Sequence, residues 1–468
     1  MRASRRGFLS GAAALALGGV CADVSPGGVA SRTQELRLRI GILADTHLNT
    51  NAAATKKFKR ALEAFRKRRV DGVLVCGDLA DNGLVPQLEE FAWTWEEVFP
   101  RSKGLGGAHV ERLFHYGDHD NRGVVSVPED VLKHYGWTES ERDANAITLH
   151  PKETWERIFD EPWSPIVHKR VKGFDFVLSH YTRELKNSAL GLEGFLRDFR
   201  PDPRKPFFFS KHRVLRNTVC GPGSWGQDDG TVGRLISSYP NCCAFCGHSH
   251  YTAAREDSIW QGAFTAVQVP SLYGVTQEPG HSNKPNGCYA EQGMLLDVYD
   301  GKMVIHRIDF VNGKPIGPAW EIPLVCNSRP FAHEARRRTA VAPEFPAGTK
   351  LIAEIRQGGD DMAGKTLSLA FPVISGIGKS VRAYDYEVTV DALCFGGDTR
   401  RAVKRFFSPK CHFAPSAEPE TMQIGIALNE FTKWNSLKSK NWGALHVEVR
   451  PREIFGGLGR AIEADVQS

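Results

Sequence analysis

The chain has 468 residues, of which 41% are hydrophobic and 24% are charged. This composition is ordinary for a folded globular protein, and the length corresponds to two or three domains of roughly 100–200 residues each. The net charge of +6 is small and spread along the chain. Because no long basic block is present, the charge gives no support to a specific nucleic-acid partner.

The N-terminus has the features of an export signal. The segment Ser4–Leu9 reads SRRGFL, which resembles the twin-arginine signature, and an apolar run follows from Phe8 to Val20. We expect cleavage after Ala22, so residues 1–22 are predicted to be a twin-arginine signal peptide. The mature protein is therefore expected to be periplasmic or extracellular.

Two membrane alternatives are disfavoured. The apolar run is rich in Gly and Ala and is shorter than the ~20 residues that a spanning helix needs. Anchoring as a lipoprotein through Cys21 would require a different cleavage pattern from the one offered by Gly18, Gly19 and Val20. No later segment is long and apolar enough to span, so we expect no transmembrane segment after signal removal.

From Leu36 to Phe310, short apolar strands alternate with amphipathic helices. The first strand is expected at 38–43, the second at 73–76 and the third at 113–116, with helices at 54–68 and 86–98 between them. Strands that alternate with helices in this way predict βαβ units and a parallel sheet. We therefore expect an α/β domain over residues 36–310.

The C-terminal part has a different character. Prolines punctuate residues 311–346, which we interpret as a linker. Residues 347–468 show alternating apolar and polar residues, with no convincing helix between the alternating segments. This pattern predicts a small all-β, sandwich-like domain. We interpret it as a packed accessory domain, with a substrate-binding or surface-binding module as the alternative.

Three of the ten cysteines, Cys242, Cys243 and Cys246, lie close together and contain a C-x-x-C spacing. Such a spacing occurs in metal and redox sites, but no second C-x-x-C completes a zinc site. We interpret the run as a buried strand in which the cysteines act as small apolar residues.

Acidic residues and histidines follow the carboxyl ends of five predicted strands. Loops at these strand ends converge on one crevice, which is where α/β folds bind ligands. Carboxylate oxygens and imidazole nitrogens suit Zn, Mn, Fe or Ni. The residues concerned are Asp45 and His47, Asp78 and Asp81, Asp118, His119 and Asp120, His212, and His248 and His250.

The order of these motifs, D-x-H, G-D-x-x-D, G-D-H-D, a single His and G-H-x-H, resembles that of the calcineurin-like metallophosphoesterases. The resemblance covers about residues 36–310 and implies a four-layer αββα sandwich. It also implies two metal ions that share Asp78. The first would bind Asp45, His47 and His250, and the second would bind Asp118, His212 and His248.

The resemblance further implies roles for three neighbouring residues. His119 would contact the substrate and assist the leaving oxygen, and Asp81 and Asp120 would orient imidazoles. His180 competes with His212 for the position of the single His. We choose His212, because the strand that precedes it opens with Lys205 and Pro206, as in the family.

One position departs from the family pattern, which carries Asn where this chain has Asp118. Both side chains offer an oxygen to a hard cation, but an ionised Asp adds a negative charge. The motifs also differ from those of the purple acid phosphatases, because those enzymes carry Gly and Tyr where His47 and Asp81 stand here.

These features predict a phosphoric ester hydrolase. A hydroxide activated by two divalent or mixed-valence metal ions, Mn, Fe, Zn or Ni, would attack a phosphoester substrate, either a monoester or a diester. The alternative is an exported binding module on a catalytically decayed scaffold. The motifs name neither the substrate nor the oligomeric state.

Overall fold

The computed structural model describes residues 35–181, 191–221, 223–276, 280–283, 291–326, 332–356, 365–374, 383–394, 397, 399–409, 420–428 and 442–467. The expected signal peptide, its cleavage after Ala22 and the alternative lipid anchor at Cys21 lie outside the described residues. These three remain predictions.

The first sheet of the α/β domain has seven strands and places β1 at its centre. The order is β12-β11-β10-β1-β2-β3, with β13 also paired to β11. Strands β1, β2 and β3 run parallel, whereas β10 lies antiparallel to β1. The strands are β1 (Leu36–Leu43), β2 (Gly72–Cys76), β3 (Glu111–His115), β10 (Gln292–Tyr299), β11 (Lys302–Asp309), β12 (Lys314–Pro315) and β13 (Trp320–Pro323).

The second sheet has six strands in the order β4-β5-β6-β7-β9-β8, and β5, β6, β7 and β9 run parallel. All five residues of β7 are buried, which agrees with the prediction that the cysteine-rich run is a core strand. The strands are β4 (Ile166–Val171), β5 (Phe174–Ser179), β6 (Phe207–Lys211), β7 (Cys242–Cys246), β8 (Ile259–Gln261) and β9 (Thr265–Gln268).

Helices cover the outer faces of both sheets. In α1, the side chain of Asn51 caps the first turn by accepting a hydrogen bond from Ala53 N, and Phe58, Leu62 and Phe65 form the buried stripe. The helices of the domain are α1 (Ala52–Lys67), α2 (Val85–Val98), α3 (Glu129–Tyr135), α4 (Glu139–Ala144), α5 (Pro151–Phe159), α6 (Leu192–Asp198) and α7 (Thr231–Ile236).

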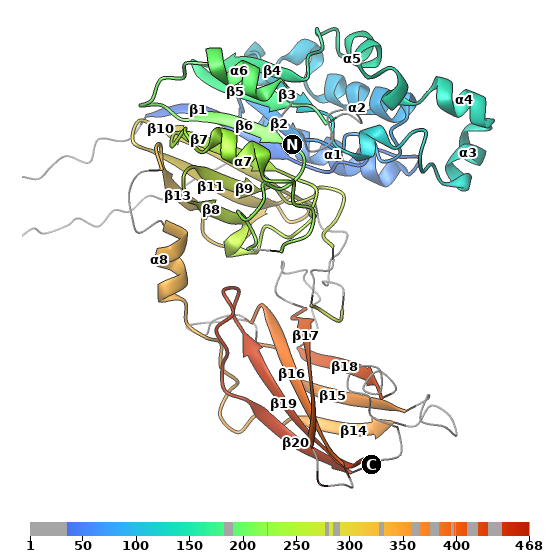
Figure 1. Cartoon of the computed structure of the whole chain (residues 1–468), viewed down its shortest axis with the longest axis vertical. Coiled ribbons are helices and arrows are strands. Elements are labelled where there is room, and N and C mark those ends of the chain that lie inside the picture. Colours follow the sequence, from blue (N-terminus) through green and yellow to red (C-terminus); the bar gives the residue numbers. More distant parts are fainter. Residues whose placement is uncertain are drawn as a thin grey trace, which may run out of the picture. The chain divides into compact units, whose positions relative to one another are not determined.

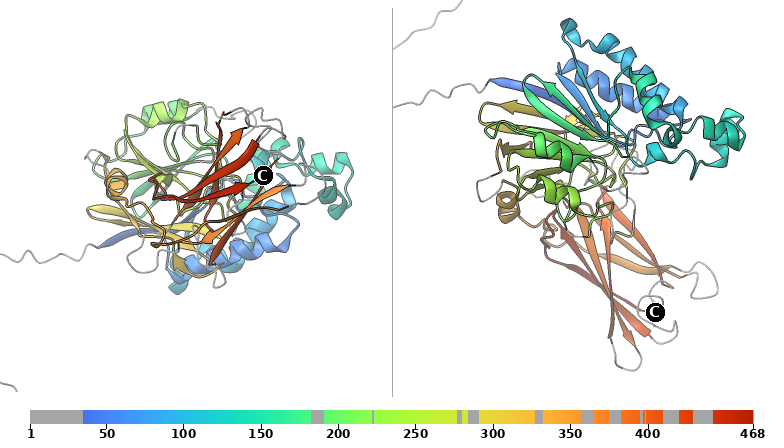
Figure 2. Two further views of the ribbon diagram at one scale, coloured as in Figure 1. Left: turned by 90° about the horizontal axis from the view of Figure 1, so that it is seen from below. Right: turned by 45° about the horizontal axis from the view of Figure 1, so that its top comes forward.

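Three apolar cores show that the domain has four layers. One core lies between the two sheets and combines residues such as Ile42 and Phe245. A second joins the first sheet to α1, α2 and α5, and a third joins the second sheet to α6 and α7. The layers can be followed in Figures 1 and 2. The predicted αββα sandwich is therefore confirmed.

The C-terminal region forms two further sheets, and the predicted all-β character is confirmed. One contains β14-β15-β18 and the other β17-β16-β19-β20, with an apolar core built from both. The strands are β14 (Ile352–Arg356), β15 (Thr366–Pro372), β16 (Asp385–Cys394), β17 (Thr399–Phe407), β18 (Thr421–Ala427), β19 (Trp442–Arg452) and β20 (Ile462–Gln467). The stretch interpreted as a linker contains β12, β13 and α8 (Ala332–Thr339).

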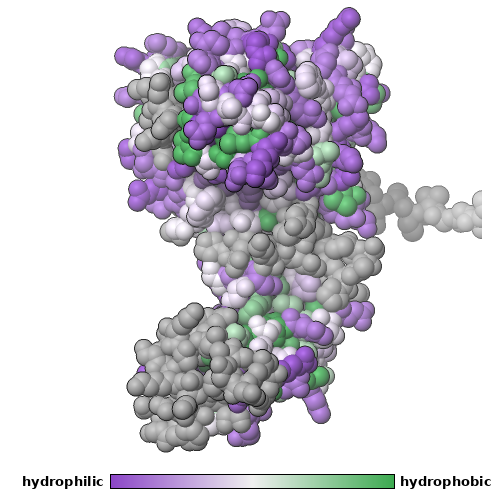
Figure 3. Space-filling view, turned by 90° about the vertical axis from the view of Figure 1, so that its right-hand side faces the viewer, coloured by the Kyte–Doolittle hydropathy of each residue, from purple (hydrophilic) through white to green (hydrophobic). Residues whose placement is uncertain are grey.

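Hydrophilic side chains predominate on the described part of the face in Figure 3, and hydrophobic ones occur there in small groups. Among the described residues, no helix combines the length and the hydropathy that crossing a membrane requires.

Candidate metal centre

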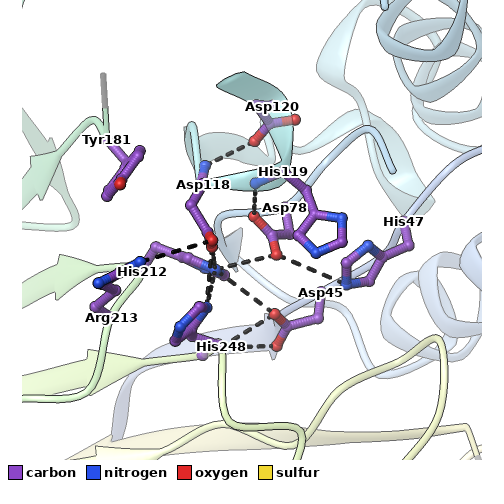
Figure 4. Close-up of polar contacts among 12 residues, drawn as sticks. Asp45, His47, Asp78, Asp118, His119, Asp120, Tyr181, His212, Arg213 and His248 are labelled. Carbon is purple, nitrogen blue, oxygen red and sulfur yellow. Dashed lines mark hydrogen bonds and ion pairs between the residues drawn. The ribbon is translucent and has the colours of Figure 1, made fainter. Parts of the chain in front are cut away.

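The predicted site residues lie in loops that follow the carboxyl ends of strands in both sheets. Asp45 and His47 follow β1, Asp78 follows β2 and Asp118 follows β3. From the second sheet, His212 directly follows β6, whereas His248 and His250 follow β7. Figure 4 shows the side chains of Asp45, Asp78, Asp118, His212 and His248 pointing toward one another.

Five of these residues adopt a left-handed backbone conformation. The φ angles are 52° for Asp45, 46° for His47, 54° for Asp78, 72° for His248 and 54° for His250. A non-glycine residue pays of order 1–3 kcal/mol for such a conformation, so the surrounding structure must hold it. Hydrogen bonds between the loops do so, for example from Asp45 N to Gly77 O at 3.1 Å and from His47 N to Asp78 O at 3.0 Å.

Two glycines of the motifs are required by close approach to the site. Gly77 has a φ of +83°, and a Cβ there would lie 2.6 Å from His212 Nδ1. Gly117 has an ordinary φ, but a Cβ there would lie 2.1 Å from Asp78 Oδ1. Gly117 is therefore needed for space beside the carboxylate, and Gly77 for both space and conformation.

The first donor set consists of Asp45, His47, Asp78 and His250, with one donor atom of each within 4.8 Å of the others. The imidazoles face each other, with 3.1 Å between His47 Nε2 and His250 Nε2. His250 Nε2 lies 3.3 Å from Asp45 Oδ1, and His47 Nε2 lies 3.7 Å from Asp78 Oδ2.

The second donor set consists of Asp78, Asp118, His212 and His248. Asp118 Oδ1 lies 2.9 Å from both His212 Nε2 and His248 Nδ1, and Asp78 Oδ2 lies 3.1 Å from His212 Nε2. His212 Nδ1 lies 2.8 Å from Cys76 O, so it acts as a donor there and leaves Nε2 to face the set. Asp78 thus belongs to both sets.

The carboxylates of this buried cluster stabilise positively charged groups next to them. Burial alone would raise the pKa of Asp118, but the imidazoles of His212 and His248 outweigh it and lower that pKa. Burial alone would lower the pKa of His212, but the carboxylates of Asp78 and Asp118 raise it well above its ordinary value. Three carboxylates in one poorly solvated site therefore stabilise cationic groups between them.

His119 and Asp81 form a pair at the edge of the cluster. His119 Nδ1 lies 2.8 Å from Asp81 O and 3.2 Å from Asp81 Oδ1, and His119 N donates to Asp78 Oδ1 at 2.9 Å. Burial alone would lower the pKa of His119, but the Asp78 carboxylate and the hydrogen bond to Asp81 raise it to about 8. Asp81 Oδ1 also lies 3.0 Å from His47 Nδ1, so Asp81 contacts two imidazoles.

Asp120, which the resemblance assigns to an imidazole, has different partners. Its carboxylate accepts hydrogen bonds from the backbone of Gly117 at 2.7 Å, Ala80 at 2.8 Å and Leu79 at 3.2 Å. The side chain is fully buried and points to the loops after β2 and β3. Asp120 therefore fixes the two loops that carry Asp78 and Asp118, and none of these three hydrogen bonds comes from an imidazole.

The structure separates the two histidines that compete for the single-His position. His212 lies within the second donor set, whereas His180 belongs to neither set. His180 Nδ1 accepts a hydrogen bond from Tyr116 N at 3.1 Å, and its ring packs edge-on against Trp155 at 4.5 Å. His180 thus supports the core beside the site.

Two residues near the centre were not anticipated as functional. Trp225 stacks on His248, with ring centroids 4.7 Å apart. Arg213 Nη2 lies 3.9 Å from Asp118 Oδ2, and its guanidinium lies over the ring of Tyr181. In the sequence GSWG, the glycines around Trp225 indicate an exposed loop, and this is the feature of the sequence from which Trp225 could have been found.

A pocket of about 500 Å³ opens beside the cluster. Its walls include Asp78 and His119 from the first sheet and Trp225 from the loop after β6. The remaining wall residues are His248, Ser249, His250, Tyr251, Thr276, Gly280 and His281.

Part of the chain matches a known protein family, and solved structures are similar to it. Residues 38–252 match the model of the calcineurin-like phosphoesterase family. A dimetal phosphatase from Danio rerio is similar in structure, at 9% identity and a TM-score of 0.37, over 63% of this chain and 100% of that one. A purple acid phosphatase from yellow lupin seeds is similar at 13% identity and a TM-score of 0.41, over 61% and 53%.

A third structure, the anchor in the inner membrane complex of Plasmodium, is similar at 10% identity and a TM-score of 0.38, over 67% of this chain and 98% of that one. No curated protein sequence matches the chain.

Proposed function

We propose that this chain, whose residues 38–252 carry a calcineurin-like phosphoesterase domain, hydrolyses phosphoesters with the help of two metal ions. The observation that carries the proposal is the pair of donor sets that share Asp78. One set offers Asp45, His47 and His250 in addition to Asp78, and the other offers Asp118, His212 and His248.

The donor atoms fit cations. Asp78 Oδ2 and Asp118 Oδ1 are buried, and within the described part of the chain neither takes part in a hydrogen bond, although imidazole nitrogens lie close to both. Within each set two imidazole nitrogens face each other, at 3.1 Å and 3.2 Å. Nitrogen and carboxylate donors of this kind suit Mn, Fe, Zn or Ni. When bound, two such ions would neutralise phosphoryl oxygens and lower the pKa of a coordinated water.

His119 supplies the proton that the leaving alcohol needs. Its Nδ1 is held by Asp81, and neighbouring carboxylates favour the protonated ring. The side chain is 18% exposed and lines the pocket, so a substrate can reach it. We assign His119 as the general acid, with Asp81 as the residue that fixes its ring orientation.

The test is hydrolysis by the purified full-length chain after chelation and reloading with Mn²⁺, Zn²⁺, Fe²⁺ or Ni²⁺ separately. We expect reloading to restore hydrolysis of p-nitrophenyl phosphate, a monoester, or of bis(p-nitrophenyl) phosphate, a diester. The relative rates then identify the ester class. A folded, metal-loaded protein that hydrolyses neither ester nor a wider panel would instead favour the binding-module alternative.

Two matched variants separate the ligand from its competitor. His212→Asn keeps a hydrogen-bond donor near Cys76 O but removes Nε2 from the second donor set. His180→Asn keeps an acceptor for Tyr116 N outside both sets. We expect His212→Asn to lose one metal ion per chain and nearly all activity, while His180→Asn keeps both ions. The reverse pattern would contradict the choice of His212.

A further inference from the structure

Trp225 lies on the loop between β6 and α7, directly against the imidazole of His248. The two rings are nearly parallel, with 4.7 Å between their centroids and 16° between their planes. One face of the indole is therefore covered, yet the residue remains 56% exposed. Single exposed aromatic side chains are common on protein surfaces, so a binding role for Trp225 requires that the loop hold the ring in this place.

The loop fits closely around the stacked pair. Gly226 has a φ of +84°, and a Cβ there would lie 2.5 Å from His248 Cδ2. Any larger residue at this position would push the loop off the imidazole. Trp225 N donates a hydrogen bond to Tyr251 Oη at 3.1 Å, and the ring of Tyr251 is buried. The backbone on both sides of the indole is thus fixed at the pocket wall.

Trp225 also shares the pocket with the reacting groups. The same cavity of about 500 Å³ is lined by Asp78, His119 and Trp225. This volume lies within the ~300–1,000 Å³ that small-molecule sites occupy, so it can hold a phosphoryl group together with a ring on its alcohol. Because His119 is assigned to the leaving oxygen, the alcohol part of the ester would lie within the pocket that the indole lines.

We propose that Trp225 is a stacking platform for the alcohol part of the substrate, which carries a flat ring, either an aryl group or a nucleobase. The inference rests on the proposed hydrolysis of phosphoesters and adds the class of substrate. Stacking on an aromatic side chain tolerates many rings, because every such ring offers a π face. The outer face of the indole supplies this surface, while its inner face packs on His248.

Selectivity tests the platform directly. In the wild type and in Trp225→Leu, kcat/KM is measured for p-nitrophenyl phosphate, a nucleoside 5′-phosphate and glycerol 3-phosphate. Comparing each substrate with itself between the two proteins removes differences in chemical reactivity. We expect the two ring-bearing esters to lose roughly ten- to hundredfold relative to the glycerol ester, the range typical of stacked bases. Trp225→Phe should retain part of the preference.

The matched control is Trp93→Leu, because Trp93 is 65% exposed on α2 and does not line the pocket. It should leave all three values unchanged. A larger loss for one ring-bearing ester than for the other identifies the aryl or the nucleoside class. An equal loss for all three esters, with or without loss of metal, would show that Trp225 only covers His248, and it would overturn the proposal.

A binding measurement separates this inference from the proposed function. Isothermal titration of the metal-loaded protein with AMP, phenyl phosphate and glycerol 3-phosphate needs no turnover. If the wild type hydrolyses nothing but Trp225→Leu selectively weakens AMP or phenyl phosphate, the platform stands and the hydrolytic function fails. If the wild type is active and neither titration nor turnover depends on the ring, the platform fails alone.

Discussion

Lys211 and Asp228 form a buried ion pair beside the candidate metal centre, and Asp228→Asn tests its contribution to stability. Lys211 Nζ lies 2.7 Å from Asp228 Oδ2, with side chains 8% and 0% exposed. Asp228 Oδ1 also accepts hydrogen bonds from Arg216 N and Gly230 N, both at 2.9 Å. The pair therefore connects β6, which leads into His212, to the loop that carries Trp225.

The substitution keeps the shape of the side chain but leaves the Lys211 ammonium buried without its counter-charge. Removing one partner of a buried pair costs about 3–5 kcal/mol. For a domain of this size, that corresponds to a fall in Tm of roughly 6–10 °C. Differential scanning calorimetry of the full-length variant measures this fall.

Two further variants show whether the buried charge is the cause. Adding Lys211→Met to Asp228→Asn removes the unpaired ammonium, so the double variant should regain much of the lost Tm. Glu129→Gln breaks an exposed pair with Lys133 and should change Tm little. A Tm for Asp228→Asn within about one degree of the wild type would refute the reasoning.

Three other predictions follow from the same structure and sequence. Asp118→Asn should remain active but lose activity at a roughly tenfold lower EDTA concentration, because a neutral oxygen holds a cation less strongly; an unchanged titration would show that Asp118 is not a charged ligand. Burial alone would raise the pKa of Asp385, but hydrogen bonds from Arg452 and from the imidazole of His281 lower it from 3.8. The stabilisation from the ionised Asp385 is present above pH 3.8 and is lost as the pH falls through the lower pKa of the folded state. Asp385→Asn should therefore flatten the acid end of a curve of Tm against pH. An unchanged slope would contradict the assignment. Replacing Arg5 and Arg6 by Lys should leave the protein in the cytoplasm when cells are fractionated, whereas normal export would indicate the general secretory route.

The position of the candidate centre could be predicted because it depends on local pattern. Each acid or histidine follows a short apolar strand, and parallel strands bring their carboxyl ends to one edge. The strand before His212 was recognisable from Lys205, Pro206 and the phenylalanines after them. The alternation of strands and helices predicted the parallel sheet, the family resemblance implied the four layers, and period-two alternation predicted the β-rich C-terminal region.

Other features depend on contacts between distant segments, and the sequence does not specify them. Asp120 could not be assigned to the backbone of Ala80 without knowing how the loops after β2 and β3 meet. The need for Gly117, which leaves space for the Asp78 carboxylate, likewise depends on how closely the loops after β2 and β3 approach each other. The stacking of Trp225 on His248 joins loops after different strands, so it emerges only from the fold.

The most direct test of two metal sites sharing one carboxylate is anomalous diffraction from crystals grown with Mn²⁺. We predict two anomalous peaks, one on each side of the Asp78 carboxylate. One peak should lie beside Asp45, His47 and His250, and the other beside Asp118, His212 and His248. A single peak, or peaks that do not adjoin Asp78, would contradict the account.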